Sequence, residues 1–221
     1  MIVVLAIITI ITSIALLGQS SFNRSIVLTG TAYTLAFSVR EAQSLGMSSR
    51  RAGTVQNAGY GVHLSSNQTS YFLFADTSPV LPGDTANPTV CPGHTALTGP
   101  EAKPGNCMYD STNEIVRTYQ LNNGFKIKSF CGTPASGGAA RCSTSPTAPL
   151  LALNILYMRP NTQSVITGIT SSAFPAPNTS RVRLTDATMR IVSPDGTTER
   201  CVYVSQVGQI SVHQPGDTLC P

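Results

Sequence analysis

Charged residues are absent from the chain before Arg24, and residues 1–18 also contain no proline. No basic residue precedes the apolar run and no small-residue A-x-A cleavage site ends it, which excludes an ordinary secretory signal peptide. The run reads MIVVLAIITIITSIALLG and is about as long as a helix that crosses a bilayer. We therefore expect residues 1–18, called here the N-terminal segment, to form a transmembrane helix.

Charge is also scarce in the rest of the chain. Charged residues make up 11% of the sequence, against about 25% in an average globular protein. Low charge with many Ser, Thr, Asn and Gly residues is typical of secreted β-rich domains. It does not indicate disorder here, because Val, Ile, Leu, Phe and Tyr are well represented. The formal net charge of +4 fits an ordinary solvated surface or, alternatively, a weak affinity for nucleic acid or anionic lipid.

The sequence lacks the short motifs of common enzyme classes. It contains no GxSxG, no HExxH and no phosphate-binding loop. Its Ser, His and Asp residues show no spacing that orders them into a triad. Asp110 and Glu114 lie four residues apart, a spacing that surface acids often have by chance. We therefore expect no enzymatic activity, no catalytic residue and no cofactor.

Six cysteines follow the N-terminal segment, and none of them forms a CxxC pair. Their irregular spacing, with His63, His94 and His213 scattered along the chain, makes a zinc site a poor explanation, and we expect no metal. An even number of cysteines indicates disulfides in an oxidising compartment. Loop length favours pairs of neighbours in the sequence, namely Cys91–Cys107, Cys131–Cys142 and Cys201–Cys220.

Beyond the N-terminal segment the helical pattern continues with one apolar stripe. Its side chains recur alternately four and three positions apart, a spacing that keeps them on one face of a helix. We predict a single helix from residue 1 to 45, with an amphipathic half at 26–45 and a stop at Gly46. The alternative is a plain membrane anchor followed by a separate core helix. The stripe consists of Leu28, Ala32, Leu35, Val39 and Ala42.

The helical period then ends, which divides the chain into an N-terminal helix at 1–50 and a β-rich head at 51–221. The pair Asn123-Gly124 predicts a type I′ hairpin between the two strands that flank it. The run at 150–158 is the most apolar and is the expected central strand. The fold class is α+β: a long helix packs its stripe on an antiparallel β-sheet with disulfide-stapled loops. Strands are predicted at 54–64, 70–74, 114–121, 125–131, 150–158, 181–192, 201–204 and 208–213.

Three parts of the chain resemble type IV pilin-like proteins, and most of all the GspH/FimT group of minor pseudopilins. Residues 1–17 resemble the apolar stretch that follows the Phe-Thr-Leu-Ile-Glu signature of prepilins. Residues 31–46, which read TAYTLAFSVREAQSLG, resemble the helix segment of the group. The run CVYVSQVGQI, at 201–210, resembles the group's last two strands. The resemblance covers nearly the whole chain, and the helix half is its more specific part.

The resemblance implies a pilin-like fold and a structural subunit of a type IV pilus or a type II secretion filament. Such a subunit spans the bacterial inner membrane once with its head extracytoplasmic, and then assembles with other pilin or pseudopilin subunits. The helix residues implied in the filament core are Met1, Val4, Ile8, Ile11 and Leu16.

The basic leader and the Phe-Thr-Leu-Ile-Glu part of the prepilin signature are missing from the sequence. The resemblance implies that both belong to a full-length precursor, which is the substrate of prepilin peptidase, and that the chain is trimmed or its start codon assigned too late. The alternative is a divergent anchor that is never processed.

A second hypothesis is a pilin-like subunit that binds DNA for uptake. Basic side chains would hold the phosphates, and basic residues two apart on one strand would share a face. Gln209 stands where the group often has arginine, which weakens this hypothesis. A third hypothesis is a simple single-pass anchored β-domain. The candidate DNA contacts, whose plainer explanation is a solvated outer face, are Lys126, Lys128, Arg181, Arg183, Arg190 and Arg200.

Overall fold

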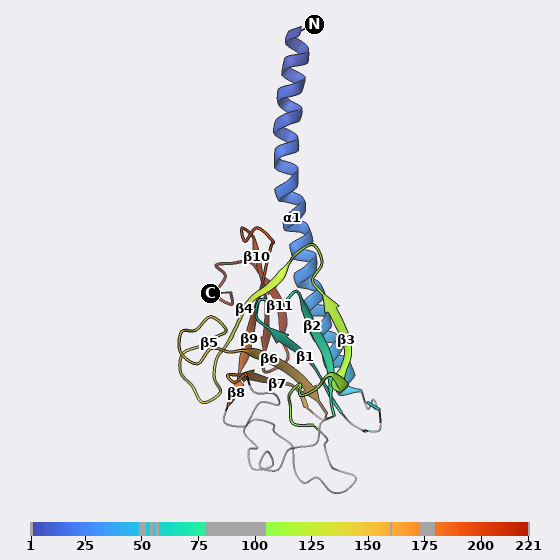
Figure 1. Ribbon diagram of the computed structural model, residues 1–221, viewed down its shortest axis with the longest axis vertical. Helices are drawn as coiled ribbons and strands as arrows, with labels where there is room; N and C mark the ends of the chain where they lie inside the picture. Colours follow the sequence, from blue (N-terminus) through green and yellow to red (C-terminus); the bar gives the residue numbers. More distant parts are fainter. Residues whose placement is uncertain are drawn as a thin grey trace.

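The computed structural model describes residues 2–48, 52, 53, 55, 58–77, 105–159, 161–172 and 180–220, and for 14–22 and 161 it describes the backbone alone. Met1, Cys91 and the side chain of Leu16 therefore lie outside the described residues. The described part is α+β, with one long helix that projects from a β-rich head (Figure 1). The predicted class, a helix packed on antiparallel strands, is confirmed.

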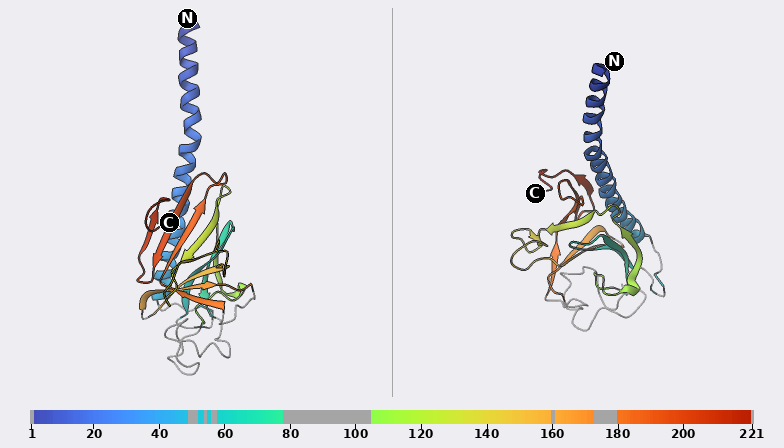
Figure 2. Two further views of the ribbon diagram at one scale, coloured as in Figure 1. Left: turned by 90° about the vertical axis from the view of Figure 1, so that its left-hand side faces the viewer. Right: turned by 45° about the horizontal axis from the view of Figure 1, so that its top comes forward.

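Helix α1 (Ile2–Met47) is continuous over 46 residues, so the single predicted helix is confirmed over the alternative of two separate helices. Its first half projects beyond the head, and its second half lies along the strands (Figures 1 and 2). The predicted stripe is fully buried: Leu28, Ala32, Leu35, Val39 and Ala42 have no exposed surface. The 3.6-residue spacing of the apolar residues thus identifies the face of the helix that packs on the head.

Gly46 does not end the helix as predicted, because α1 continues to Met47. The glycine is instead buried where the helix meets a strand of the head. A Cβ atom built on Gly46 would lie 2.2 Å from the backbone oxygen of Tyr157. The sequence therefore has glycine at this position because the helix backbone and the strand backbone touch.

Eleven strands of the described residues form two antiparallel sheets, whereas the sequence predicted one. The first sheet has six strands in the order β3-β2-β1-β6-β7-β8. Strand β6 is buried at every residue, which confirms the expected central strand, while the sequence analysis predicted no strand where β7 lies. The strands are β1 (Gly59–Ser65), β2 (Ser70–Asp76), β3 (Ile115–Gln120), β6 (Ala152–Met158), β7 (Asn161–Ile169) and β8 (Arg181–Leu184).

The second sheet has five strands in the order β11-β10-β9-β4-β5. A turn at Asp195-Gly196 joins β9 and β10, which pair along their length. The strands are β4 (Lys126–Gly132), β5 (Arg141–Cys142), β9 (Asp186–Val192), β10 (Glu199–Ser205) and β11 (Ile210–His213).

Two strand predictions are wrong in an instructive way. Asn123 and Gly124 do adopt the positive φ angles of a tight turn, 60° and 75°, but the strands on either side do not pair with each other. Strand β3 pairs with β2 in the first sheet, and β4 pairs with β9 in the second. The predicted strand 181–192 is likewise divided at Thr185 into β8 and β9, which belong to different sheets.

One hydrophobic core joins α1 to both sheets. The stripe of α1 packs with side chains of the first sheet such as Val62 and Ile155, and with side chains of the second such as Met189 and Val202. Both sheets therefore face this stripe, and the two positions at which the chain changes sheets join strands of the same core. Polar contacts add to the docking: the Ser38 hydroxyl lies 2.8 Å from the Tyr71 hydroxyl in a buried site.

Candidate assembly surface and basic neck

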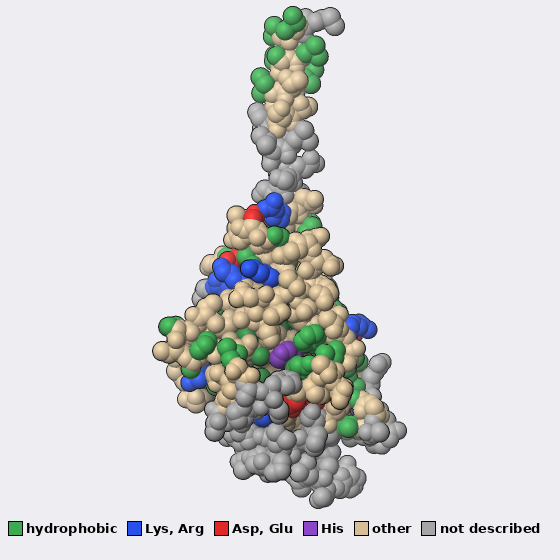
Figure 3. All heavy atoms as spheres, in the orientation of Figure 1, with side chains coloured by type: hydrophobic (Ala, Val, Ile, Leu, Met, Phe, Trp, Pro, Cys, Tyr) green, Lys and Arg blue, Asp and Glu red, His purple; other side chains and the backbone are tan. Residues whose placement is uncertain are grey.

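The projecting end of α1 exposes large apolar side chains to solvent. Ile2, Val4, Ile8 and Ile11 are between 52% and 85% exposed, and green hydrophobic atoms mark this end in Figure 3. Soluble monomers rarely expose a contiguous apolar surface beyond a few hundred Å², and larger patches mark sites of protein or membrane contact. The described part of the N-terminal segment is therefore a candidate assembly surface.

The few polar side chains on this surface bond to the backbone of their own helix. The Thr12 hydroxyl donates to the backbone oxygen of Ile8 at 2.8 Å, and the Ser13 hydroxyl donates to that of Thr9 at 2.7 Å. A hydroxyl bonded in this way can enter an apolar environment without losing its partner. Among the described residues, no helix combines the length and the hydropathy that crossing a membrane requires.

Four of the six candidate basic residues come together where α1 leaves the head. Arg200 ties β10 to the helix, because its Nε donates to the Thr29 hydroxyl and its Nη2 to the Ser25 hydroxyl, each at 3.1 Å. Arg24 of the helix pairs with Asp195 in the turn between β9 and β10. Lys126 is placed by strand pairing, because Lys126 of β4 and Glu199 of β10 lie opposite Val192 from its two sides. We call this group the basic neck: Arg24, Lys126, Lys128, Arg190 and Arg200, with Asp195 and Glu199.

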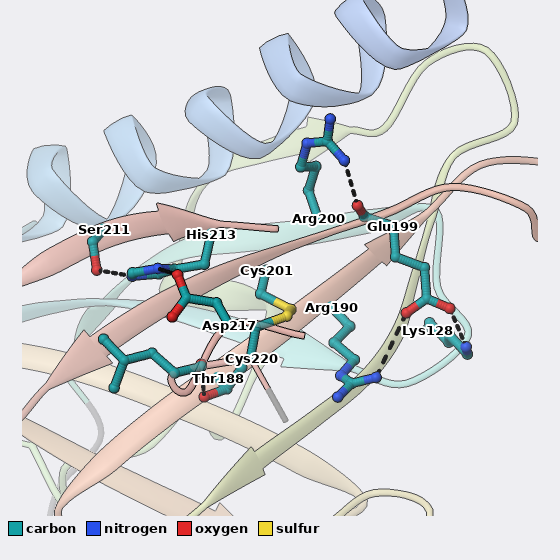
Figure 4. Close-up of a disulfide and its surroundings, with 11 residues drawn as sticks. Lys128, Thr188, Arg190, Glu199, Arg200, Cys201, Ser211, His213, Asp217 and Cys220 are labelled. Carbon is teal, nitrogen blue, oxygen red and sulfur yellow. Dashed lines mark hydrogen bonds and ion pairs between the residues drawn. A yellow bond between two sulfur atoms is a disulfide. The ribbon is translucent and has the colours of Figure 1, made fainter. Parts of the chain in front are cut away.

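Glu199 is the hub of the basic neck. One carboxylate oxygen pairs with Lys128, and the other lies 3.6 Å from Arg190 (Figure 4). The three residues come from β10, β4 and β9, which are neighbours in the second sheet, so cross-strand pairing brings them together. In Figure 3 blue Lys and Arg side chains gather on the part of the head nearest the projecting helix.

The other two candidates, Arg181 and Arg183, lie on β8 at the edge of the first sheet. Arg181 is only 8% exposed, and burial lowers the pKa of Arg183. Neither strand pairing nor any contact described above joins them to the basic neck. The six residues therefore do not form one surface, and a DNA contact stays a prediction.

Two of the three predicted disulfides are present in the described residues. Cys131–Cys142 closes the loop between β4 and β5, and Cys201–Cys220 ties the C-terminal tail to β10. Cys107 is also disulfide-bonded, while Cys91 lies outside the described residues, so the Cys91–Cys107 pair stays a prediction.

A hydrogen-bonded series that the sequence analysis missed lies beside the second disulfide. The Ser211 hydroxyl is 2.7 Å from His213 Nε2, and His213 Nδ1 is 2.6 Å from a carboxylate oxygen of Asp217 (Figure 4). The order of groups matches a nucleophile, a base and an orienting acid. The same contacts fasten the tail to β11 next to Cys201–Cys220, and this structural role accounts for all three side chains. The His213–Asp217 contact lowers the pKa of Asp217.

Asp110 and Glu114 are buried and not surface acids as their spacing suggested. Glu114 accepts a hydrogen bond from the Asp110 backbone at 2.8 Å and another from the Thr77 backbone at 3.0 Å. Asp76, whose pKa burial raises, accepts bonds from the backbones of Asn106 and Cys107. These carboxylates hold the segment before β3 against the end of β2. The described residues contain no group that could hold a metal ion.

Comparison of the chain with protein-family models, with curated proteins and with solved structures gives no match. What the protein does must therefore be argued from the geometry of α1 and the head.

Proposed function

We propose that the protein is a structural subunit of a type IV pilin-like filament, either a pilus or a type II secretion pseudopilus. One observation carries the proposal: a single helix of 46 residues is buried against the head in one half and exposes apolar side chains in the other. The resemblance to minor pseudopilins of the GspH/FimT group supports the same assignment. In this account the protein works by assembly and not by catalysis.

Two environments would cover the exposed apolar surface in turn. In a membrane, the helix satisfies its own backbone hydrogen bonds, and the 22 residues from Ile2 to Asn23 reach about 33 Å, close to the thickness of the hydrocarbon core. In a filament, the same side chains would pack against the helices of other subunits. We propose that the bacterial inner membrane holds the subunit first, with the head extracytoplasmic, and that prepilin peptidase processes its precursor.

The docked half of α1 carries a second surface that favours contacts between subunits. Ile26, Tyr33 and Phe37 are 54%, 50% and 66% exposed, on the side of the helix opposite its buried stripe. Gly30 lies between them in sequence, and a Cβ atom there would meet nothing within 4 Å. Apolar side chains on this face extend the apolar surface of α1 toward the head, where another subunit could cover both.

The test compares substitutions of two β-branched aliphatic residues at similar exposure. Ile11, near the centre of the stretch from Ile2 to Asn23, is 61% exposed, and Val207 in the turn after β10 is 70% exposed. A charge at the centre of a membrane-spanning helix is costly, by about 3 kcal/mol on insertion scales. In the native host, we expect Ile11→Asp to lose both membrane retention and incorporation into sheared surface filaments, while Val207→Asp keeps both.

Each fraction in this experiment decides one part of the proposal. Equal behaviour of the two variants in both fractions would refute the role of the projecting helix. Membrane retention that depends on Ile11, in cells whose filaments never contain the protein, would instead assign a simple single-pass anchored β-domain.

A further inference from the structure

We propose that the basic neck binds the anionic headgroups of the bilayer that holds α1. The inference rests on the proposed function and adds a partner to it: phosphate groups of lipids at the membrane surface. Arg24 is the first charged residue of the chain, and it follows the helix segment that would cross the hydrocarbon core. The neck would therefore lie at headgroup level whenever that segment is inserted.

Two sets of contacts place the neck at the point where α1 leaves the head. Arg24 joins the helix to the turn between β9 and β10, and Arg200 joins the helix to β10 itself. A cavity of about 410 Å³ at this level is lined by Asn23, Arg24 and Val27 of the helix together with Phe125, the residue before Lys126. Arg24 and Arg200 are thus held beside the part of the helix that leaves the head, while Lys128 and Arg190 bond to Glu199, the neighbour of Arg200 on β10.

Charge at the neck is unbalanced. The group contains five cations and two carboxylates, Asp195 and Glu199, and only Arg24, Lys128 and Arg190 pair with those carboxylates, so three positive charges are in excess. Glu199 alone serves both Lys128 and Arg190, so neither cation is fully neutralised. Each Lys or Arg near an anionic membrane surface contributes about 1 kcal/mol, which is about a fivefold change in binding.

The available donors suit a lipid surface. Lys126 is exposed, and the side chains of Lys128 and Arg24 are 46% and 42% exposed. Arg200 has its donors directed to the helix and to its own strand, so it positions the neck more than it binds. A bilayer fits this arrangement better than a nucleic acid because Arg24, an exposed cation, lies on the helix after its uncharged run, and a bilayer offers phosphate beside hydrocarbon.

The experiment measures flotation of the full chain, diluted from detergent, with two kinds of vesicle. One kind is phosphatidylcholine alone, and the other is equal parts phosphatidylcholine and phosphatidylglycerol. The test variant is Lys126→Gln with Lys128→Gln. The control, Arg40→Gln with Arg159→Gln, removes two exposed cations far from the neck. Arg40 lies close enough to Tyr157 for its charge to oppose the rise in pKa that burial causes in that tyrosine, and Tyr157 contacts Gly46 near the end of α1.

We expect the anionic vesicles to bind the native chain more tightly than the neutral ones. The lysine variant should bind the anionic vesicles about 5- to 25-fold more weakly than the native chain does. Added salt should remove the extra affinity of the native chain for anionic over neutral vesicles, called here the increment. The control variant should keep it, and all three proteins should bind neutral vesicles equally. An unchanged increment in the lysine variant would overturn the inference, as would lysine-dependent binding of duplex DNA without any increment on anionic vesicles.

The two proposals fail separately in this experiment. Ile11→Asp reports on the projecting helix, because its binding to neutral vesicles depends on apolar insertion and not on charge. If Ile11→Asp binds neutral vesicles as the native chain does, the proposed membrane role of α1 fails, whatever the lysine variant shows. If only the lysine comparison fails, α1 keeps its role and the neck loses its lipid partner.

Discussion

Two glycines of α1 show how one residue type serves opposite needs along a single helix. Gly46 is buried where the helix backbone touches the carbonyl of Tyr157, while Gly30 faces open space. Glycine in the interior of a helix lowers stability relative to alanine by about 0.5–1 kcal/mol. The loss at Gly46 is offset by close packing, whereas at Gly30 the structure of the isolated subunit offers no such compensation.

We therefore expect Gly46→Ala and Gly30→Ala to change stability in opposite directions. Gly46→Ala should lower the free energy of unfolding by about 1–3 kcal/mol, since the new methyl group overlaps backbone that cannot easily move. Gly30→Ala should raise it by about 0.5–1 kcal/mol. Denaturant titration of both variants in the same detergent measures the difference, and a stable Gly46→Ala variant would show that the two backbones do not touch.

His63 sets a pH dependence at the residue scale. Burial lowers its pKa to about 4 from 6.5, partly opposed by the hydrogen bond to Asn154, and Phe72 and Tyr109 cover the ring. Between these two values the unfolded chain binds more protons at this position than the folded one, so the contribution of His63 to stability is lost as pH falls. Burial raises the pKa of Asp76 above 3.8, so the contribution of Asp76 to stability is instead lost as pH rises above that value.

The contribution of His63 is isolated by His63→Gln, which does not titrate. The native chain should lose up to about 3 kcal/mol more stability than the variant when pH falls from above 6.5 to below 4. Unfolding free energies of both proteins across this window measure the difference. Parallel pH curves for the two proteins would mean that the imidazole is not buried.

At the scale of elements, α1 carries two apolar faces with different partners. Leu35 belongs to the buried stripe and has no exposed surface, while Phe37 lies on the outer face and is 66% exposed. Leu35→Ala should lower the free energy of unfolding of the isolated subunit by about 2–5 kcal/mol. Phe37→Ala should change it by less than about 0.5 kcal/mol and act on assembly instead. Denaturation of both variants, with their recovery in filaments, tests this division, which equal losses of stability would contradict.

The helix could be predicted from the sequence because its signal is local. The spacing of Leu28, Ala32 and Leu35 reports a single helix face whatever the rest of the chain does. Strand pairing has no comparable local signal: the turn at Asn123-Gly124 forms, yet its flanking strands join different sheets. The burial of Glu114 was unpredictable for the same reason, since its partners Thr77 and Asp110 meet it only in the folded head.

The two candidate surfaces also differ in whether their sequence signal is local. The exposed apolar helix end was visible as an uncharged run before Arg24, but the basic neck was not visible as a group. Lys128, Arg190 and Glu199 are far apart in sequence and meet only because β4, β9 and β10 are neighbours. Arg181 and Arg183, which look equivalent in the sequence, lie on the other sheet.

The whole molecule is a head fixed to one end of a long helix. The buried stripe, the Arg200 contacts and the shared core join the docked half of α1 to both sheets, so forces on the projecting half reach the head directly. Such a body suits a filament in which helices pack at the centre and heads face outward.

Site-specific photo-crosslinking in filaments from the native host tests the central claim most directly. A photoreactive residue at Ile8 lies on the apolar helix end, and the same residue at Val207 lies on the head at comparable exposure. We predict that Ile8 crosslinks to the N-terminal helix of another filament subunit, and that Val207 gives no adduct with such a helix. Filaments that contain the protein but yield no helix-to-helix adduct from Ile8 would contradict the account.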